Sequence, residues 1–253
     1  MESSGPDFNF IHLDTVNSTN SYLIDLLSKT SPTDGFCVFS DFQTEGRGQY
    51  GRIWQSYPAV NILASFAYRT SWLEEKQVFC LNQISALAVL GVLQDYLPGE
   101  DIVIKWPNDI LCNRKKIAGI LIQNIFRGSQ MQWSVVGIGL NVNQTDFDPS
   151  LIATSMRQVA GLNFDRMLLL RALHDRLNHL MALKSGDRNF DLLDDYNASL
   201  FGHGQKVLLE KTGGIRFEAV LLGVDESGNL RMNVDGRFQS MDWSMVRIIL
   251  PAG

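Results

Sequence analysis

The chain is short of the features that mark secreted, metal-binding and membrane proteins. Its 253 residues contain three cysteines, Cys37, Cys80 and Cys112, and these form no Cys-x-x-Cys pair of the kind that binds zinc or cycles between redox states. We therefore expect free, buried thiols in a reducing compartment, the cytoplasm. No apolar run approaches the roughly 20 residues of a membrane helix. The segment Met1 to Asp7 does not have the pattern of a secretion signal.

Lysine and arginine are not clustered. The formal net charge is -5, and no long basic block forms an electrostatic footprint for nucleic acid. DNA or RNA binding is therefore not expected. The hydrophobic content of 45% is that of a globular chain with a substantial core.

Strands are predicted throughout the first part of the chain from runs rich in β-branched and aromatic residues. A Gly-containing turn at Arg127-Gly128-Ser129 joins the last two as a hairpin. The predicted strands are Phe8 to Leu13, Phe36 to Phe42, Val60 to Tyr68, Ile102 to Trp106, Ile117 to Phe126 and Gln132 to Val142.

Helices are predicted between and after these strands. Asn17 or Ser18 is expected to cap the first helix. A long helix is expected from Glu74 to Tyr96, before Pro98-Gly99, and helices dominate from Ser155 to Ser199.

The pattern changes near residue 200, at Phe201-Gly202-His203-Gly204. Beyond it, short strands alternate with turns at Thr212 to Gly214, Glu226 to Asn229 and Val234 to Gly236. Closely spaced strands and turns are typical of a small β-barrel. We therefore expect two domains, residues 1–200 and 201–253. The C-terminal one either covers a ligand or guides a partner, or serves only as a packing domain.

The most informative segment is Gln43-Thr44-Glu45-Gly46-Arg47-Gly48-Gln49-Tyr50-Gly51-Arg52-Ile53-Trp54. Its glycines let the backbone approach an anion, and its two arginines add charged, forked donors. The loop therefore suits a phosphate or a carboxylate, although a flexible surface loop would explain the composition equally well.

Two lysine-containing segments follow. In Ile104-Lys105-Trp106-Pro107-Asn108-Asp109-Ile110, a lysine on an apolar strand needs an anionic partner if it is buried. An edge lysine facing water before an ordinary turn is the alternative. In Arg114-Lys115-Lys116-Ile117-Ala118-Gly119, a basic cluster meets a strand glycine, as happens where a ligand lies against the backbone.

A fourth segment, Asn17-Ser18-Thr19-Asn20, offers an amide and hydroxyls to a neutral polar ring, although helix capping by Ser18 explains part of it. In this order the four segments resemble the biotin protein ligase family, which has Ser-Thr-Asn, Gln then Gly-Arg-Gly-x-x-Gly-Arg and Trp, Lys-Trp-Pro-Asn-Asp, and Lys-[Leu/Ile]-Ala-Gly-Ile-Leu. The glycine-rich run Val136 to Asn143 and the C-terminal region extend the likeness over nearly the whole chain.

Two features depart from the bifunctional members of that family. Gln49 stands where they have a second loop arginine, and no room precedes Phe8 for the winged helix-turn-helix that makes some members repressors. The resemblance therefore implies a monofunctional ligase.

The resemblance implies an α+β fold, with a mixed β-sheet backed by helices as in class II aminoacyl-tRNA synthetases, and a C-terminal SH3-like β-barrel. It implies an enzyme that uses ATP to form biotinyl-5'-AMP and transfers the biotin to a lysine of a biotin carboxyl carrier domain. The oligomeric state stays open between monomer and homodimer. A lipoate or octanoate ligase of the same fold and a non-catalytic binding module are the alternatives.

Attack of a carboxylate on a phosphate brings two anions together, so we expect catalysis by cationic positioning. The resemblance gives catalytic roles to Lys105 at the reacting groups, Arg47 at the phosphate and Asp109 near the acceptor amine. It places Ser18, Thr19, Asn20, Gln43, Gly46, Arg47, Gly48, Gln49, Lys116 and Gly119 around biotin, and Arg47, Arg52, Trp54, Lys105, Asn108, Lys116 and Asn141 around ATP or the adenylate.

Magnesium is expected with ATP because it neutralises phosphate charge. Asp109 either contacts the ion or holds Lys105, and the sequence does not choose between the two. His174 and His179 lie one turn apart on a predicted helix. Their polar neighbours suggest a solvated face, so we assign them no metal.

Overall fold

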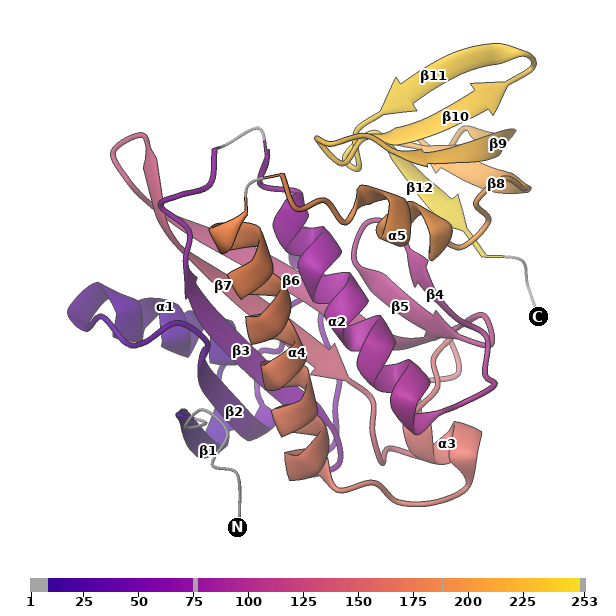
Figure 1. Cartoon of the computed structure of the whole chain (residues 1–253). Helices are drawn as coiled ribbons and strands as arrows, with labels where there is room; N and C mark the ends of the chain where they lie inside the picture. The colour runs from indigo at the N-terminus through magenta and orange to yellow at the C-terminus, as the bar shows by residue number, and fades with distance from the viewer. Residues whose placement is uncertain (1–8, 75–76, 188, 251–253) are drawn as a thin grey trace.

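The computed structural model describes residues 9–74, 77–187 and 189–250, which form two β-sheets and their helices (Figure 1). The larger sheet has the strand order β1-β2-β3-β7-β6-β5-β4. β1 runs parallel to β2 and the other neighbours are antiparallel, so the sheet is mixed, as expected. Its strands are β1 (Phe10–Val16), β2 (Phe36–Gln43), β3 (Ile62–Arg69), β4 (Ile102–Lys105), β5 (Asp109–Cys112), β6 (Lys115–Arg127) and β7 (Gln130–Leu140).

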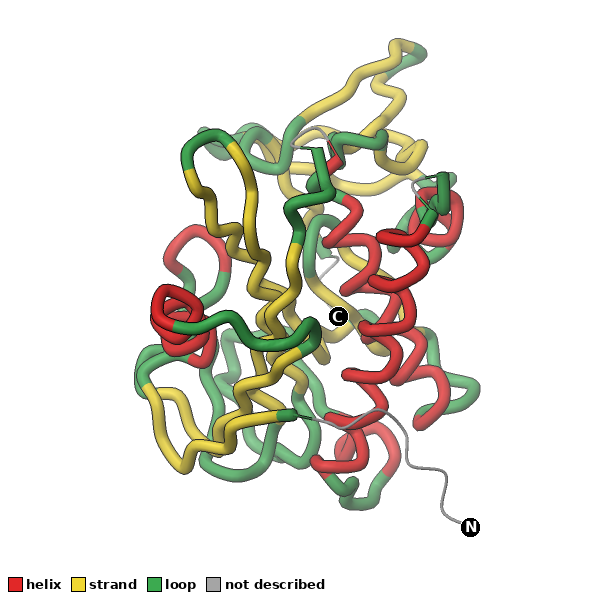
Figure 2. The backbone as a smooth tube through the Cα atoms, turned by 60° about the vertical axis from the view of Figure 1, so that its left-hand side comes forward, coloured by secondary structure: helices red, strands yellow, loops and turns green. Residues whose placement is uncertain are grey.

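Helices cover both faces of this sheet (Figure 2). On one face α2 (Cys80–Tyr96) packs beside α4 (Arg166–Gly186), and α2 contacts β4, β5 and β6. On the other face α1 (Thr19–Lys29) contacts β2, β3 and β7. The short helices are α3 (Met156–Ala160), α5 (Leu193–Ala198) and the 3-10 turn η1 (Gln49–Gly51).

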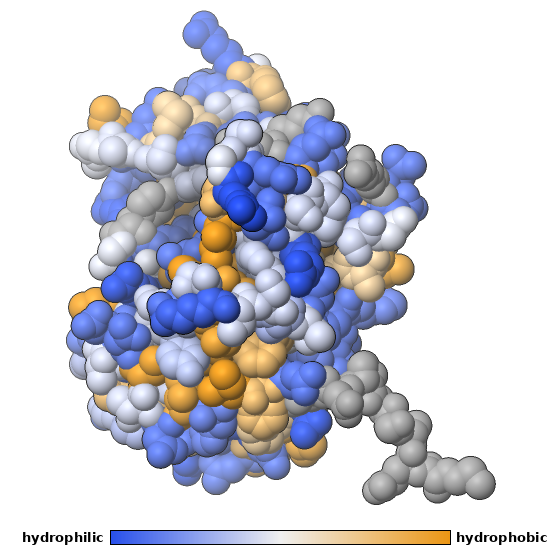
Figure 3. Space-filling view, turned by 90° about the vertical axis from the view of Figure 1, so that its left-hand side faces the viewer, coloured by the Kyte–Doolittle hydropathy of each residue, from blue (hydrophilic) through white to orange (hydrophobic). Residues whose placement is uncertain are grey.

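The two faces account for the alternation along the strands. Cys37 and Phe39 on β2 belong to the main core beneath α2 and α4, whereas Val38 between them packs with Leu23 of α1. Successive strand residues point to opposite faces, so both sets are buried in a sheet covered on both sides. The face shown in Figure 3 is mainly hydrophilic, with hydrophobic side chains gathered in its middle and over its lower half.

The second sheet follows residue 200 in the chain. It is antiparallel, with the order β11-β10-β9-β8-β12, and fits the expected SH3-like domain. The indole N–H of Trp106, at the end of β4, donates a 2.9 Å hydrogen bond to the carbonyl of Gly228. This bond ties the two sheets together beside the predicted site. The strands are β8 (Lys206–Lys211), β9 (Arg216–Val224), β10 (Leu230–Val234), β11 (Arg237–Met241) and β12 (Val246–Ile249).

Most predicted elements are present, with shifted ends. The long helix begins at Cys80 rather than Glu74, and part of the intervening segment lies outside the described residues. The first strand starts at Phe10, and Phe8 likewise lies outside them. β5 was not predicted, because its first residue follows a proline and an asparagine that suggest only a turn.

Three smaller expectations have mixed outcomes. Ser18 holds the N-cap position of α1, as predicted, although its side chain makes no capping hydrogen bond. All three cysteines are buried and unpaired, as predicted. His174 is only 4% exposed, so its assignment to a solvated face is wrong. No helix within the described ranges is long and apolar enough to cross a membrane.

Candidate active site

A cavity of about 510 Å³ lies where the start of α1, the loop between β2 and β3, and the ends of β4, β6 and β7 meet. Gly46, among the expected site residues, lines an adjoining cavity of about 960 Å³. The structure brings all the others together around the first cavity: Ser18, Thr19, Asn20, Gln43, Arg47, Gly48, Gln49, Arg52, Trp54, Lys105, Asn108, Asp109, Lys116, Gly119 and Asn141.

Two lysines meet one carboxylate in this cavity. Lys105 and Asp109 pair across the β4–β5 hairpin, with Nζ 3.6 Å from Oδ2, and the Nζ of Lys116 on β6 lies 2.5 Å from Oδ1. The side chains of Lys105 and Asp109 are 17% and 14% exposed, so the water-facing edge lysine considered from the sequence is wrong. Two cations against one anion leave a net positive charge, which favours an anionic ligand.

Burial lowers the pKa of Lys105 below its ordinary value. Asp109 opposes this shift, whereas the neighbouring charges of Lys116 and Arg52 add to it. Desolvation disfavours the charged form of a lysine, and so do nearby cations. A ligand phosphate or carboxylate would stabilise the ammonium that its surroundings destabilise.

Trp54 forms one wall of the cavity over two glycines. A Cβ on Gly119 would stand 2.9 Å from the indole ring, and a Cβ on Gly139 would stand 2.5 Å from it. Trp54 therefore packs against Gly119, which also lines the cavity. The Nζ of Lys116 lies 5.3 Å from the ring centroid. The buried indole N–H of Trp54 has no hydrogen-bond acceptor among the described residues.

The glycine- and arginine-rich loop folds back on itself beside the cavity. Arg47 forms an isolated β-bridge with Ile53, and the N–H of Trp54 donates to the carbonyl of Gly46 at 2.9 Å. The side chain of Arg47 is 55% exposed and lies 3.7 Å from Glu45. Arg52 is also exposed. Both guanidinium groups thus lie at the cavity with access to solvent.

Another part of the cavity wall is polar and neutral. Gln43 Oε1 accepts a 2.7 Å hydrogen bond from the N–H of Thr19, and its distance to Thr19 Oγ1 is 3.1 Å. Ser65, on β3, was missed from the sequence. Its hydroxyl lies 2.7 Å from Thr19 Oγ1 and 2.5 Å from Asn20 Oδ1. The sequence feature that could have identified Ser65 is its position as a hydroxyl residue in the middle of the apolar run Val60 to Tyr68.

Two asparagines hold the strand ends that shape the cavity. The amide of Asn108 donates to the carbonyl of Ile120 at 2.7 Å, and that of Asn141 donates to the carbonyl of Thr154 at 3.0 Å. Both side chains line the cavity while bracing its backbone.

The C-terminal sheet also contributes to the cavity, through β12 and the residue Trp243. Arg247 on β12 lines the cavity, whereas Arg216 does not and pairs with Glu210 at 2.8 Å. The sequence did not single out β12, because an apolar strand of a small barrel looks the same whether or not it faces a ligand.

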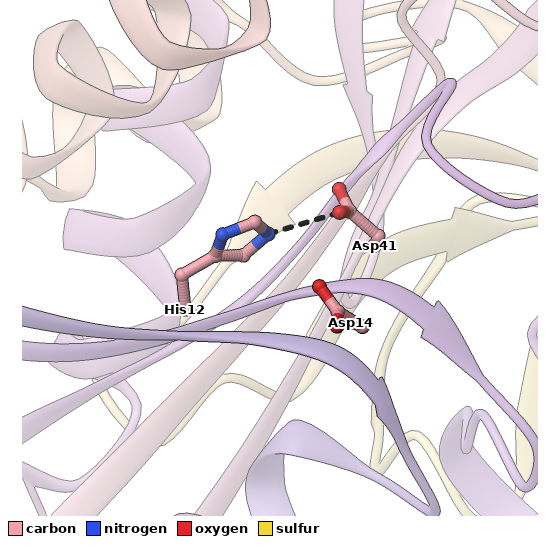
Figure 4. Close-up of side chains that lie close together, drawn as sticks. All are labelled: His12, Asp14 and Asp41. Carbon is pink, nitrogen blue, oxygen red and sulfur yellow. Dashed lines mark hydrogen bonds and ion pairs between the residues drawn. The ribbon is translucent and has the colours of Figure 1, made fainter.

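A cluster of possible metal ligands lies on β1 and β2 (Figure 4). The ligand atoms of His12, Asp14 and Asp41 all lie within 4.8 Å of one another. Asp41 is already engaged, by His12 at 3.0 Å and by Arg166 at 2.8 Å. A guanidinium beside the carboxylate opposes a second cation, so we assign no metal to this cluster.

Comparisons with known proteins found related sequences and structures. The model of the biotin/lipoate A/B protein ligase family matches residues 13–141. The chain is 30% identical over 234 residues to a biotin--[acetyl-CoA-carboxylase] ligase of Mycobacterium tuberculosis, covering 89% of this chain and 84% of that protein. It is 36% identical over 164 residues to the bifunctional ligase/repressor BirA of Bacillus subtilis, covering 62% of this chain and 49% of BirA.

Solved structures show the same fold. The biotin protein ligase of Aquifex aeolicus, in complex with biotin and ATP, superimposes with a TM-score of 0.76. The match covers 96% of this chain and 99% of that one, at 23% identity. The apo structure of the same protein has a TM-score of 0.72.

Proposed function

The chain belongs to the biotin/lipoate A/B protein ligase family, and we propose that it is an ATP-dependent biotin protein ligase. It forms biotinyl-5'-AMP and transfers the biotin to a lysine of a biotin carboxyl carrier domain. One observation carries this proposal: two lysines, the two loop arginines and a group of neutral polar side chains converge on one cavity. Such a cavity accommodates a molecule with a polar ring at one end and a carboxylate at the other.

The first step joins the biotin carboxylate to the α-phosphate of ATP and releases pyrophosphate. The cationic groups act by holding two mutually repelling anions together and by stabilising the charge that grows on the phosphoryl oxygens. We assign Lys105 to both reacting groups and Lys116 to the carboxylate. Arg47 and Arg52, on the loop, bind the phosphates and close over the adenylate. Asn108 and Asn141 position the strand ends at the nucleotide.

Asp109 fits the role of a positioning group better than that of a metal ligand. Both of its oxygens face ammonium groups, at 3.6 and 2.5 Å, so a divalent cation would have to displace a lysine. When bound, Mg²⁺ would supply charge neutralisation of the ATP phosphates, which is its usual role beside nucleotides. Asp109 holds the two lysines, and lies near enough to the reacting carboxylate to take a proton from the acceptor amine.

Biotin is held at its two ends. Ser18, Thr19, Asn20 and Gln43 surround the ureido ring, where an unmade hydrogen bond would leave a buried polar group unpaired. Trp54 contributes an apolar wall and a buried N–H donor that lacks a protein acceptor among the described residues. The loop approaches the bound acyl chain through Gly46, Gly48 and Gln49. Gly119 has no side chain and so leaves room for the indole of Trp54.

We further propose that residues 1–200 form the catalytic domain and residues 201–253 the SH3-like domain. The five strands of the second sheet, which all follow residue 200, support this boundary. The free thiols support a cytoplasmic location for the protein, because cysteines stay unpaired in a reducing compartment. The partner is a carrier domain, with no nucleic acid, and the enzyme acts as a monomer or homodimer.

The test is a transfer assay with labelled biotin, ATP, magnesium and a purified biotin carrier domain, with lipoate and octanoate as competing acids. Biotin should become attached to the carrier lysine, and neither lipoate nor octanoate should. Transfer of lipoate but not biotin would identify the chain as a lipoate ligase instead, and transfer of neither would leave it as a binding module.

A further inference from the structure

Residues 106–108 form the turn that joins β4 to β5, here called the β4–β5 turn. It connects Lys105 to Asp109, whose side chains meet across the hairpin. The first residue of the turn is fixed to the C-terminal sheet, through the buried hydrogen bond from the indole of Trp106 to the carbonyl of Gly228. The position of the turn is therefore not set by the hairpin alone.

The other two residues of the turn are held by different elements. The side-chain amide of Asn108 donates to the carbonyl of Ile120 on β6 at 2.7 Å, and the N–H of Ile120 donates to the carbonyl of Asn108 at 2.9 Å. The carbonyl of Pro107 accepts a 3.1 Å hydrogen bond from the hydroxyl of Tyr196 on α5. A proline has no N–H, so this carbonyl is its one backbone hydrogen-bonding group.

Tyr196 is buried where the two domains meet. Its side chain is 0% exposed, and the ring of Phe79 packs edge-on against it with the centroids 5.5 Å apart. Burial raises the pKa of Tyr196 above its ordinary value, so the hydroxyl keeps its hydrogen and can donate. Helix α5 lies between the two sheets and contacts α2 and β9 (Figure 1). The next residue, Asn197, accepts the N–H of Val224 on β9 at 2.7 Å, so the helix that carries Tyr196 is itself anchored.

We propose that Tyr196 is a positioning residue whose hydrogen bond to Pro107 holds Asp109 opposite Lys105. The proposal rests on the proposed function, in which Lys105 takes part in adenylate formation. Tyr196 lines neither cavity, so it acts through the backbone of the turn. Pro107 is two residues from each of the two charged groups, and a shift of its carbonyl therefore changes the distance between them.

That distance decides how strongly Asp109 supports the charge of Lys105. Asp109 raises the pKa of Lys105 against the effect of burial. The other charged groups that act on this ammonium are Lys116 on β6 and Arg52 on the loop, and both lower its pKa. A misplaced Asp109 would therefore leave Lys105 among groups that favour its neutral form.

The first experiment compares Tyr196→Phe with the wild-type enzyme by pyrophosphate exchange. Because phenylalanine fills the same space, the variant should fold. The kcat for adenylate formation should fall about tenfold or more, because a misplaced charge stabilises the transition state less well. The KM values for biotin and ATP should stay within about twofold. The alkaline limb, where the rate falls as the pH rises, should move toward lower pH, because Lys105 loses its proton earlier.

The matched control is Tyr68→Phe. It removes the hydroxyl of another tyrosine in the same core, which is 3% exposed and donates to Asn178 Oδ1 at 2.8 Å. Both variants should lower the Tm by similar amounts, and only Tyr196→Phe should change the kinetics. A lower Tm for Tyr196→Phe with wild-type kcat and an unmoved alkaline limb would overturn the proposal and leave Tyr196 as a packing residue.

A second measurement tests whether the effect passes through Asp109. In an Asp109→Asn background, Tyr196→Phe should leave the alkaline limb where Asp109→Asn alone places it, since the carboxylate that it positions is already gone. A further shift in that background would also overturn the proposal. A wild-type enzyme that forms no adenylate from biotin and ATP would refute the proposed function instead.

Discussion

Gly139 on β7 lies directly against the indole of Trp54, where a Cβ would stand 2.5 Å from the ring. Its ladder partner on β6 is Gly119, whose Cβ would meet the same ring at 2.9 Å. Two glycines paired across adjacent strands thus let the indole of Trp54 pack directly against the backbone of the sheet. The position of the cavity wall depends on their lack of side chains.

Gly139→Ala should displace Trp54 and lower kcat/KM for biotin by about tenfold or more, because a misplaced wall loosens the reactive geometry. The fold should survive, since Trp54 belongs to a loop that can shift. Thermal unfolding and steady-state kinetics measure the two effects. Gly186→Ala, at the end of α4 with no atom near the new methyl group, is the control. Wild-type kinetics for Gly139→Ala would remove Trp54 from the site.

Lys105→Ala should reduce adenylate formation by about a hundredfold or more, because it removes a charge that stabilises the transition state. Pyrophosphate exchange measures this step without the acceptor. Lys29→Ala, which removes a lysine that is 65% exposed, should have no effect. A normal exchange rate in Lys105→Ala would show that the role assigned to Lys105 is wrong.

Asp109→Asn should move the alkaline limb of adenylate formation toward lower pH. Asp109 raises the pKa of Lys105 against the effect of burial. Loss of the carboxylate therefore lowers that pKa further, and the ammonium form is lost earlier as the pH rises. Lys116→Gln removes a cation that lowers the same pKa, so its alkaline limb should move the opposite way. If the alkaline limb of adenylate formation in both variants lies at the same pH as in the wild-type enzyme, the ionisation of Lys105 does not control it.

Biotin plus ATP should protect the loop from trypsin at Arg47 and Arg52. Both side chains are exposed, and a loop that closes over the adenylate loses accessible backbone. Arg237, on the distant edge strand β11, should be cleaved at the same rate with and without ligands. Equal cleavage of the loop in both states would argue that it does not close.

Gln49→Arg should slow release of biotinyl-adenylate by about tenfold and reduce stray labelling of unrelated lysines. Gln49 lines both cavities, so a guanidinium here can reach phosphate or carboxylate oxygens. A well-made charged hydrogen bond contributes roughly 1.5 to 3 kcal/mol. A chase with unlabelled biotin measures the release, and an unchanged rate would place this side chain outside the site.

The sequence predicted the strands best where apolar and β-branched residues run uninterrupted, as in β2, β6 and β7. It missed β5 because Asn108 and Asp109 favour a turn locally, and only pairing with β4 and β6 makes the segment a strand. His174 was placed on the wrong face because α4 carries charged residues on more than one side. Burial of such a helix is decided by its neighbours.

The site residues that could be predicted from the sequence are those whose own side chains carry charge. Residues whose role depends on a contact with a residue distant in the sequence could not be predicted. Arg47, Lys105 and Lys116 carry charge, so each stands out in an apolar or glycine-rich setting. Ser65 carries one hydroxyl, and its importance comes from Thr19 and Asn20, which are distant in the sequence. The contact between Gly119 and Trp54 was missed for the same reason, since nothing local in the sequence shows that the two residues meet.

The strand β7 also fixes the spacing between two contacts of the cavity wall. Gly137 lies against the side chain of Asn20, and Gly139 lies against the indole of Trp54. Residues two apart on a strand are about 7 Å apart, and pairing with β3 on one side and β6 on the other keeps that spacing rigid. A slip of β7 by one residue would turn both glycines away from these side chains, so the register of the strand and the shape of the cavity are set together.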